Sequence, residues 1–229
     1  MEVNLTALAV DANFEPITQA GFQYRQTNVY PYLAAKGFAI RRCQGSLARR
    51  IYVAPAARQA NVIYITGIGH GTYDTFTGDY YDPVYSVGNY SPEEVQGKIV
   101  HLLSCETAGK LGPDLVSHGC RAFFVTTKIF RFNSFQMDIA DIFFQCDSEI
   151  DRAFADGLTA ADVYSRVVAL FDKNIAALRA QGSDYKRNHG IRSGSSPGTV
   201  VRTAVGGPQR KGWLETAGGM CFASRPSAH

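Results

Sequence analysis

Two apolar runs of the sequence each lead into a chemically reactive side chain. They are residues 62–71, VIYITGIGHG, which contain His70, and residues 98–105, KIVHLLSC, which end in Cys105. Both runs are continuous rather than alternating, which is typical of strands in a parallel sheet that is covered on both faces. Other short apolar runs alternate with helix-like patterns along the chain, in the order of an α/β protein. We therefore predict an α/β fold in which a mainly parallel central sheet is flanked by helices on both faces.

The remaining elements follow from the same patterns. Strands are expected at residues 3–10, 38–43, 50–53, 62–66, 98–103 and 121–127, and helices at 27–36, 113–118, 135–155 and 160–181. Ser91 and Pro92, followed by two glutamates, are typical of a helix start. We expect residues 1–182 to form the core, and the Gly-, Ser- and Pro-rich residues 183–229 to form loops of the same domain, with one short strand at 199–204.

Composition restricts the function classes. The chain has 229 residues, of which 45% are hydrophobic and 19% charged, with a net charge of +3. The basic residues are scattered, so no nucleic-acid partner is predicted. The longest apolar runs are strand-sized and the first residues lack the features of a secretory signal, so we expect no membrane span and a cytoplasmic location.

The cysteines indicate neither a disulfide framework nor a zinc ribbon. There are five, at positions 43, 105, 120, 146 and 221, and none forms a CxxC pair. We predict no cofactor and no metal. His101 lies inside a predicted strand and is expected to be a core residue with its polar atoms satisfied.

His70 and Cys105 form the candidate catalytic pair. If the two apolar strands are adjacent and parallel, their ends share one edge of the sheet, where functional groups of open α/β folds gather. A thiolate is the attacking form of cysteine, and an imidazole can take the thiol proton and later protonate the leaving group. Gly71 has no side chain, so its backbone N–H could stabilise an oxyanion together with the N–H of Cys105.

These stretches resemble the caspase-like cysteine peptidases of clan CD, in which one apolar strand ends in His-Gly and the next ends in the nucleophilic cysteine. Residues 102–108, LLSCETA, followed by residues 118–122, HGCRA, are most similar to the bacterial CHAT-type proteases. The resemblance implies a caspase-haemoglobinase-like fold and a cysteine endopeptidase with a Cys-His dyad. It also implies activation of a protein partner in a bacterial defence or cell-death pathway.

A peptidase needs a pocket for a substrate side chain. Asp11, Glu106 and Asp114 are candidates for binding a basic side chain of a protein or peptide substrate, whereas Arg25 or Arg42 would favour an acidic one. Two alternatives stay open: a non-catalytic caspase-like module that holds a partner, and a Cys-His acyl hydrolase that acts on a small molecule.

Overall fold

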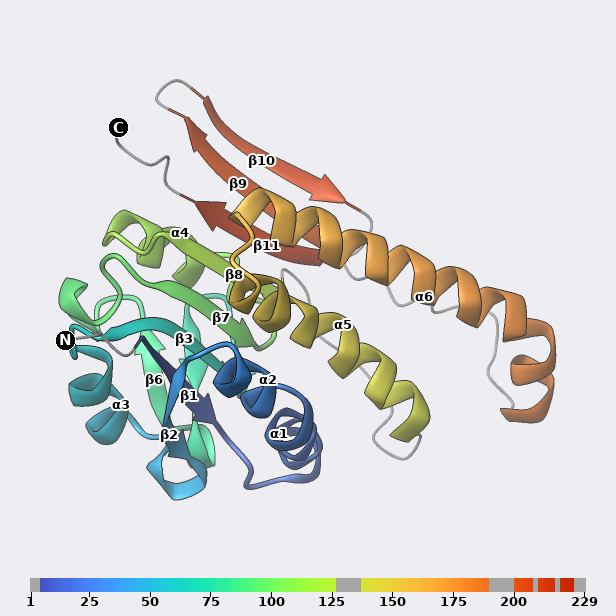
Figure 1. The fold of residues 1–229 in the computed structure, drawn as a ribbon, viewed down its shortest axis with the longest axis horizontal. Helices are drawn as coiled ribbons and strands as arrows, with labels where there is room; N and C mark the ends of the chain where they lie inside the picture. Colours follow the sequence, from blue (N-terminus) through green and yellow to red (C-terminus); the bar gives the residue numbers. More distant parts are fainter. Residues whose placement is uncertain (1–4, 127–136, 190–199, 208–209, 217–218, 225–229) are drawn as a thin grey trace.

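The chain is built on one central eight-stranded sheet (Figure 1). The computed structural model describes residues 5–126, 137–189, 200–207, 210–216 and 219–224. The strand order is β10-β9-β11-β8-β7-β3-β1-β2. Five neighbouring strands are parallel: β2 (Ala39–Gln44), β1 (Thr6–Asp11), β3 (Val62–Ile68), β7 (Ile99–Leu103) and β8 (Ala122–Thr126). The predicted α/β architecture with a mainly parallel central sheet is confirmed.

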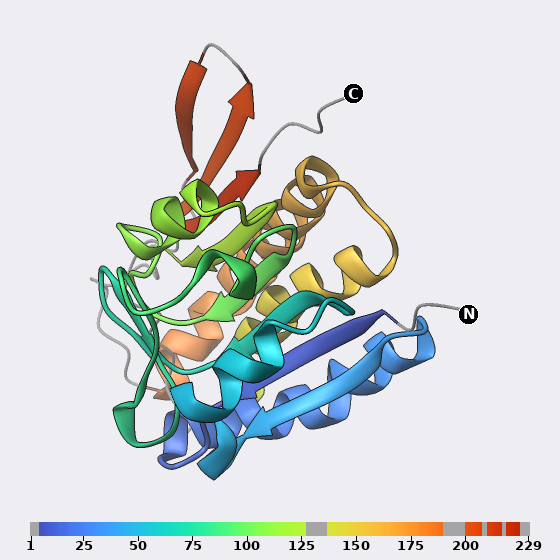
Figure 2. The ribbon, with the colours of Figure 1, turned by 90° about the vertical axis from the view of Figure 1, so that its left-hand side faces the viewer.

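Helices cover both faces of this sheet (Figures 1 and 2). Side chains of α3 (Arg50–Ala57), α4 (Leu111–Ser117) and a small second sheet pack on one face. On the other face lie α1 (Pro16–Asn28), α2 (Tyr30–Ala35), α5 (Met137–Ala155) and α6 (Ala160–His189). Since both faces are buried, the central strands are apolar throughout, as their sequence predicts.

The small sheet leaves the end of β3. It consists of β4 (His70–Gly71), β5 (Thr75–Thr77) and β6 (Pro83–Ser86), all antiparallel. The buried rings of Phe76 and Tyr85 anchor it to the main core. His70, two residues beyond the end of β3, is therefore held in a paired strand.

The C-terminal segment adds three strands to the central sheet. They are β9 (Val200–Gly207), β10 (Arg210–Thr216) and β11 (Gly219–Ser224), and β11 pairs antiparallel with β8. The one short strand expected at 199–204 overlaps β9, with residue 199 outside the described residues. The rest of 183–229 was expected to form loops, whereas its described residues belong to α6, β9, β10 and β11. Gly206, Gly207, Gly212 and Gly219 lie within paired strands. Helix α6 continues to His189, beyond the expected end at 181.

Two other expectations were wrong. Residues 50–53, predicted as a strand, begin helix α3, whose buried side chains Val53, Ala54, Ala56 and Ala57 follow helical spacing. Helix α1 was not predicted, and the helix expected at 27–36 is the shorter α2. Ser91 does form a capping box with Glu94, but the element it begins is the short 3₁₀ helix η3 (Pro92–Glu94).

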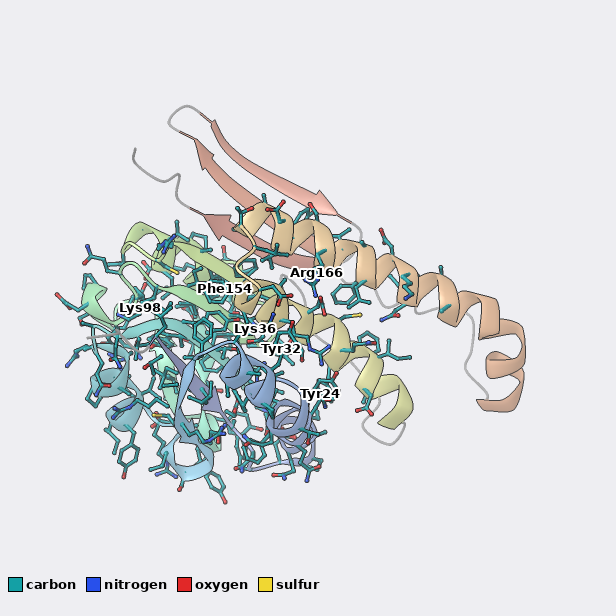
Figure 3. All side chains as sticks on the ribbon, in the orientation of Figure 1. Tyr24, Tyr32, Lys36, Lys98, Phe154 and Arg166 are labelled. Atoms are coloured by element: carbon teal, nitrogen blue, oxygen red, sulfur yellow. The ribbon has the colours of Figure 1, made fainter. Side chains whose placement is uncertain are left out.

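Polar contacts join the helices on one face of the sheet. Tyr32 on α2 and Lys36 directly after it both reach Asp156, at 2.7 Å each, and Arg166 on α6 lies 2.9 Å from the same side chain. Figure 3 shows Tyr32, Lys36 and Phe154 close together where α2 meets α5. In the part of the chain that is described, no helix combines the length and the apolar character needed to cross a membrane.

Candidate active site

The ends of β3 and β7 bring His70 and Cys105 to one edge of the sheet. The two strands are adjacent and parallel, as predicted, with Ile68 opposite Leu103. The N–H of Gly69 donates to the carbonyl of Leu103 at 3.2 Å. His70 and Cys105 each lie two residues beyond this last pair, so the chain leaves both strands at the same level.

The loops that carry the two residues are packed together. A Cβ atom at Gly71 would lie 2.3 Å from the Cys105 carbonyl oxygen and 2.7 Å from the Thr107 methyl group. The Tyr73 carbonyl accepts a hydrogen bond from the N–H of Lys110 at 2.9 Å. The Tyr73 ring lies over Gly109, where an added Cβ would be only 2.1 Å away. Their relative position is therefore fixed by backbone contacts.

Gly71→Ala is expected to separate these loops. The new methyl group would overlap the Cys105 backbone, which cannot rotate away, and overpacking of this kind costs about 1–3 kcal/mol. Thermal unfolding and thiol reactivity of Cys105 measure the effect. Gly88→Ala is the control for Cys105 reactivity: its φ of 86° is strained for alanine, which lowers stability, but no atom lies within 4 Å of an added Cβ, so the Cys105 thiol should be unaffected. An equal change of Cys105 reactivity in the two variants would contradict the proposed loop contact.

His70 is half-buried between aromatic rings and a carboxylate. Its ring stacks on Tyr81 with centroids 5.0 Å apart, and the Phe14 ring lies edge-on at 6.1 Å. Its Nε2 atom lies 3.3 Å from Oε1 of Glu15. Phe14 and Glu15 follow β1, which neighbours β3 on the side away from β7. His70 is therefore flanked by the β1 loop on one side and the Cys105 loop on the other.

Glu15 is held rigidly in this position. It caps the N-terminus of α1, where its carboxylate accepts hydrogen bonds from the N–H groups of Ile17 at 2.9 Å and Thr18 at 2.6 Å. Burial tends to raise the pKa of Glu15, but these hydrogen bonds and the nearby His70 outweigh it, so the pKa is lowered. Glu15 was not predicted as a site residue. Its signal was the Glu15-Pro16 pair, a helix start directly after a strand.

Cys105 differs from Cys43, Cys120 and Cys146 in its exposure. Cys43, Cys120 and Cys146 are buried, whereas Cys105 is half-exposed. Burial raises the pKa of Cys120 to about 12 and that of Cys146 to about 11, which makes them poor nucleophiles. Glu106, the next residue, has a φ of 56°, in the left-handed region that residues other than glycine rarely adopt. This conformation turns the chain sharply behind the thiol.

The predicted substrate-binding residues occupy three different environments. Glu106 is exposed next to Cys105. Asp114 lies on α4, where it accepts a hydrogen bond from the Tyr90 hydroxyl at 2.5 Å. Asp11 is completely buried, and its carboxylate contacts Arg25 at 3.2 Å. Asp11 and Arg25 therefore pair with each other and are not open to a substrate, and Arg42 is exposed on β2 with its guanidinium over the Tyr30 ring.

Arg25 is the centre of a buried network next to the strands that carry the candidate site. The guanidinium lies 3.3 Å from Asp151 and 4.0 Å from Asp147 on α5. His101 on β7 lies 3.1 Å from Asp147 and 3.2 Å from Asp151. As expected, His101 is a core residue. The network ties α1 and α5 to the strands that carry the candidate site.

This network also contains the one metal-like cluster found among the described residues. His101, Asp147 and Asp151 offer ligand atoms within 4.8 Å of one another. The positive guanidinium of Arg25 already lies against both carboxylates, and it would repel a metal ion. We therefore interpret the cluster as an ion-pair network.

The network predicts that stability falls in mildly alkaline solution. Burial opposes the charge on His101, but Asp147 and Asp151 outweigh it and raise the pKa of His101 to about 9, from 6.5. A raised pKa means that the stabilisation is complete below pH 6.5 and is lost as the pH rises through about 9. The free energy of unfolding should fall across this window, by at most about 1.4 kcal/mol per pH unit for the single proton. Denaturant unfolding from pH 6 to 9 measures it, and a flat or rising profile would contradict the assignment.

No protein-family model matches the chain, and no curated protein matches it.

Proposed function

We propose that the protein is a cysteine endopeptidase in which Cys105 is the nucleophile and His70 the general base. The observation that carries the proposal is the placement of these two residues directly after adjacent parallel strands, with their loops in backbone contact. The His70 imidazole would take the Cys105 proton, and the thiolate would attack the carbonyl carbon of the scissile peptide bond. The imidazolium would then protonate the leaving amine, and water would hydrolyse the thioester.

Backbone donors near Cys105 support the proposed oxyanion site. The N–H of Thr72 donates to the carbonyl of Thr75, so this pair is a hydrogen-bonded one in the β4–β5 ladder. Such pairs alternate with non-hydrogen-bonded pairs, which makes Gly71 and Phe76 the latter kind. The Gly71 N–H therefore turns away from β5. Together with the Cys105 N–H, it is our candidate for stabilising the negative oxygen of a tetrahedral intermediate.

Glu15 is the proposed positioning residue for His70. The Glu15 carboxylate lies 3.3 Å from Nε2 without accepting a hydrogen bond from it, and its negative charge favours the tautomer that carries the proton there, which leaves Nδ1 to act as the base. It also stabilises the imidazolium that forms when the thiol is deprotonated. Glu15 would thus have the role of the carboxylate in a Ser-His-Asp triad, in an arrangement of Cys, His and Glu.

The first test is cleavage of an internally quenched peptide library that is mixed at the residues on both sides of the scissile bond. A parallel mass-spectrometric map of iodoacetamide labelling identifies the reactive thiol. We expect cleavage, and we expect Cys105 to be labelled faster than Cys43, Cys120 and Cys146. If no peptide is cut and Cys105 reacts no faster than the buried thiols, the peptidase proposal is wrong and a partner-binding module becomes the better hypothesis.

Glu15→Gln should lower kcat/KM by about 10²-fold, within the range of up to about 10⁴-fold known for carboxylates that orient a catalytic histidine. The amide can still cap α1 through its oxygen, so the thermal midpoint should change little. The pH at which Cys105 becomes half-reactive toward iodoacetamide should rise, since the imidazolium loses its counter-charge. Glu93→Gln removes an equal charge from the exposed η3 turn and is the control. An unchanged pH profile in Glu15→Gln would leave Glu15 with a capping role alone.

A further inference from the structure

Three aromatic rings form a continuous surface next to His70. Phe14 stacks on Tyr80 with centroids 5.1 Å apart and meets Tyr81 edge-on at 4.9 Å. Tyr81 in turn stacks on the imidazole of His70 at 5.0 Å. Phe14, Tyr80 and Tyr81, which we call the aromatic surface, thus extend directly from the proposed general base.

The two tyrosines are presented to solvent by a strained turn. Tyr80 is 71% exposed and Tyr81 58%, although large aromatic side chains are usually buried. Both lie in the short 3₁₀ turn η2 (Asp79–Tyr81), with φ angles of 46° and 63°. Left-handed backbone at residues other than glycine is strained, and such strain gathers at functional sites.

Neighbouring contacts hold this turn in place. Asp79 forms an ion pair with Arg49 at 2.7 Å, and its N–H donates to the Ala48 carbonyl at 2.8 Å. The carbonyl of Asp82 accepts from the N–H of Gly78 at 2.8 Å. These contacts fix the turn in a conformation that exposes both rings.

The order of the strands places this surface along the path of a bound peptide. Cys105 follows β7, His70 follows β3, and Phe14 follows β1, in the spatial order β7-β3-β1. A peptide with its scissile bond at Cys105 and His70 would have a neighbouring residue over the aromatic surface.

The local charges favour an apolar occupant. The carboxylates on the adjoining elements are engaged within the protein: Glu15 with the first turn of α1 and with His70, Asp79 with Arg49, and Asp82 with the N–H of Arg50 at 2.8 Å. A basic side chain would therefore find few charges to neutralise it. A large apolar or aromatic side chain could bury its surface against the three rings.

We propose that the aromatic surface is a specificity subsite, which binds a large apolar or aromatic side chain of the peptide next to the scissile bond. This inference rests on the proposed peptidase function. It replaces the acidic residues Asp11 and Asp114 as the main determinants of substrate choice, because these two are engaged within the protein.

The test compares two internally quenched peptides with an acetyl-Gly-Gly-X-Gly-Gly-amide core, where X is Phe or Ala. The wild type should cut the Phe peptide with a kcat/KM about tenfold higher. Tyr80→Ala is the informative variant. Tyr80 stacks on Phe14, whereas Tyr81 stacks on His70, so removing the Tyr81 ring would also disturb the proposed general base. Tyr80→Ala should raise KM for the Phe peptide about tenfold, leave kcat unchanged and leave the Ala peptide unaffected. Tyr80→Phe should behave as the wild type, and so should Leu5→Ala, which alters an exposed apolar residue just before β1.

Equal cleavage of the two peptides by the wild type, or an equal loss of both in Tyr80→Ala, would overturn the subsite. Titration of the Cys105→Ala protein with the unlabelled peptides, followed by NMR, separates binding from catalysis. If the wild type cuts neither peptide but Cys105→Ala binds the Phe peptide through Tyr80, the peptidase proposal fails and the surface is a peptide-binding site. If neither cleavage nor binding occurs, the subsite proposal fails too.

Discussion

Cys105→Ala and His70→Ala are each expected to lower peptide hydrolysis by at least about 10³-fold, the largest change in activity that we predict for any substitution. Each removes a group needed for the same step, since the thiol has no base without His70 and the imidazole has no nucleophile without Cys105. The double variant should therefore be no slower than the slower single variant. Steady-state kinetics on one peptide from the library measure all three rates.

Two controls separate a loss of catalysis from a loss of structure. Cys43→Ala removes a buried thiol at the end of β2 and should leave kcat/KM unchanged. Thermal unfolding of each variant shows whether the fold is retained, which we expect because Cys105 and His70 are both half-exposed. If the two single losses multiply in the double variant, Cys105 and His70 act independently and the dyad is wrong.

Arg25→Met should cause the largest loss of stability, about 3–5 kcal/mol. The guanidinium is 1% exposed and contacts Asp11, Asp147 and Asp151, so its removal leaves buried carboxylates without their main counter-charge. Asp151 depends strongly on the positive charge of Arg25. Burial opposes its ionisation, but the charges of Arg25 and His101 outweigh burial and hold the pKa of Asp151 well below its usual range.

The matched control is Arg166→Met. Arg166 also contacts two carboxylates, Glu149 and Asp156, but it is 41% exposed. Solvent screening limits such pairs to about 0–1 kcal/mol. Denaturant unfolding at pH 7 compares the two variants. Equal losses in Arg25→Met and Arg166→Met would show that the buried network contributes no more than a surface ion pair.

The central part of the fold could be predicted because its strands are buried on both faces. Residues 62–66 and 98–103 show this as continuous apolar runs, and the two strands proved adjacent and parallel. The start of α3 could not be predicted, since Ile51, Tyr52 and Val53 favour a strand and only packing against the sheet selects a helix. Of the three C-terminal strands, β9 overlaps the strand expected at 199–204, whereas β10 and β11 were expected to be loops. The pairing of β11 with the distant β8 is encoded by no local pattern.

Only part of the candidate site could be predicted from the sequence. His70 and Cys105 could be found because strand ends at one edge of a sheet come together. Glu15 could not, because its approach to His70 depends on β1 lying beside β3 and on an unpredicted helix start. Asp11 shows the opposite error: its position at a strand end suggested substrate binding, but Arg25, from a helix the sequence pattern did not reveal, occupies it.

The most direct test of the proposed dyad is the rate of Cys105 alkylation by iodoacetamide between pH 5 and 10, in the wild type and in His70→Ala. The half-reactive pH of Cys105 should lie well below the ordinary value for cysteine of about 8.5 in the wild type and should return toward it in His70→Ala. Identical profiles in the two proteins would show that His70 does not activate Cys105 and would contradict the account.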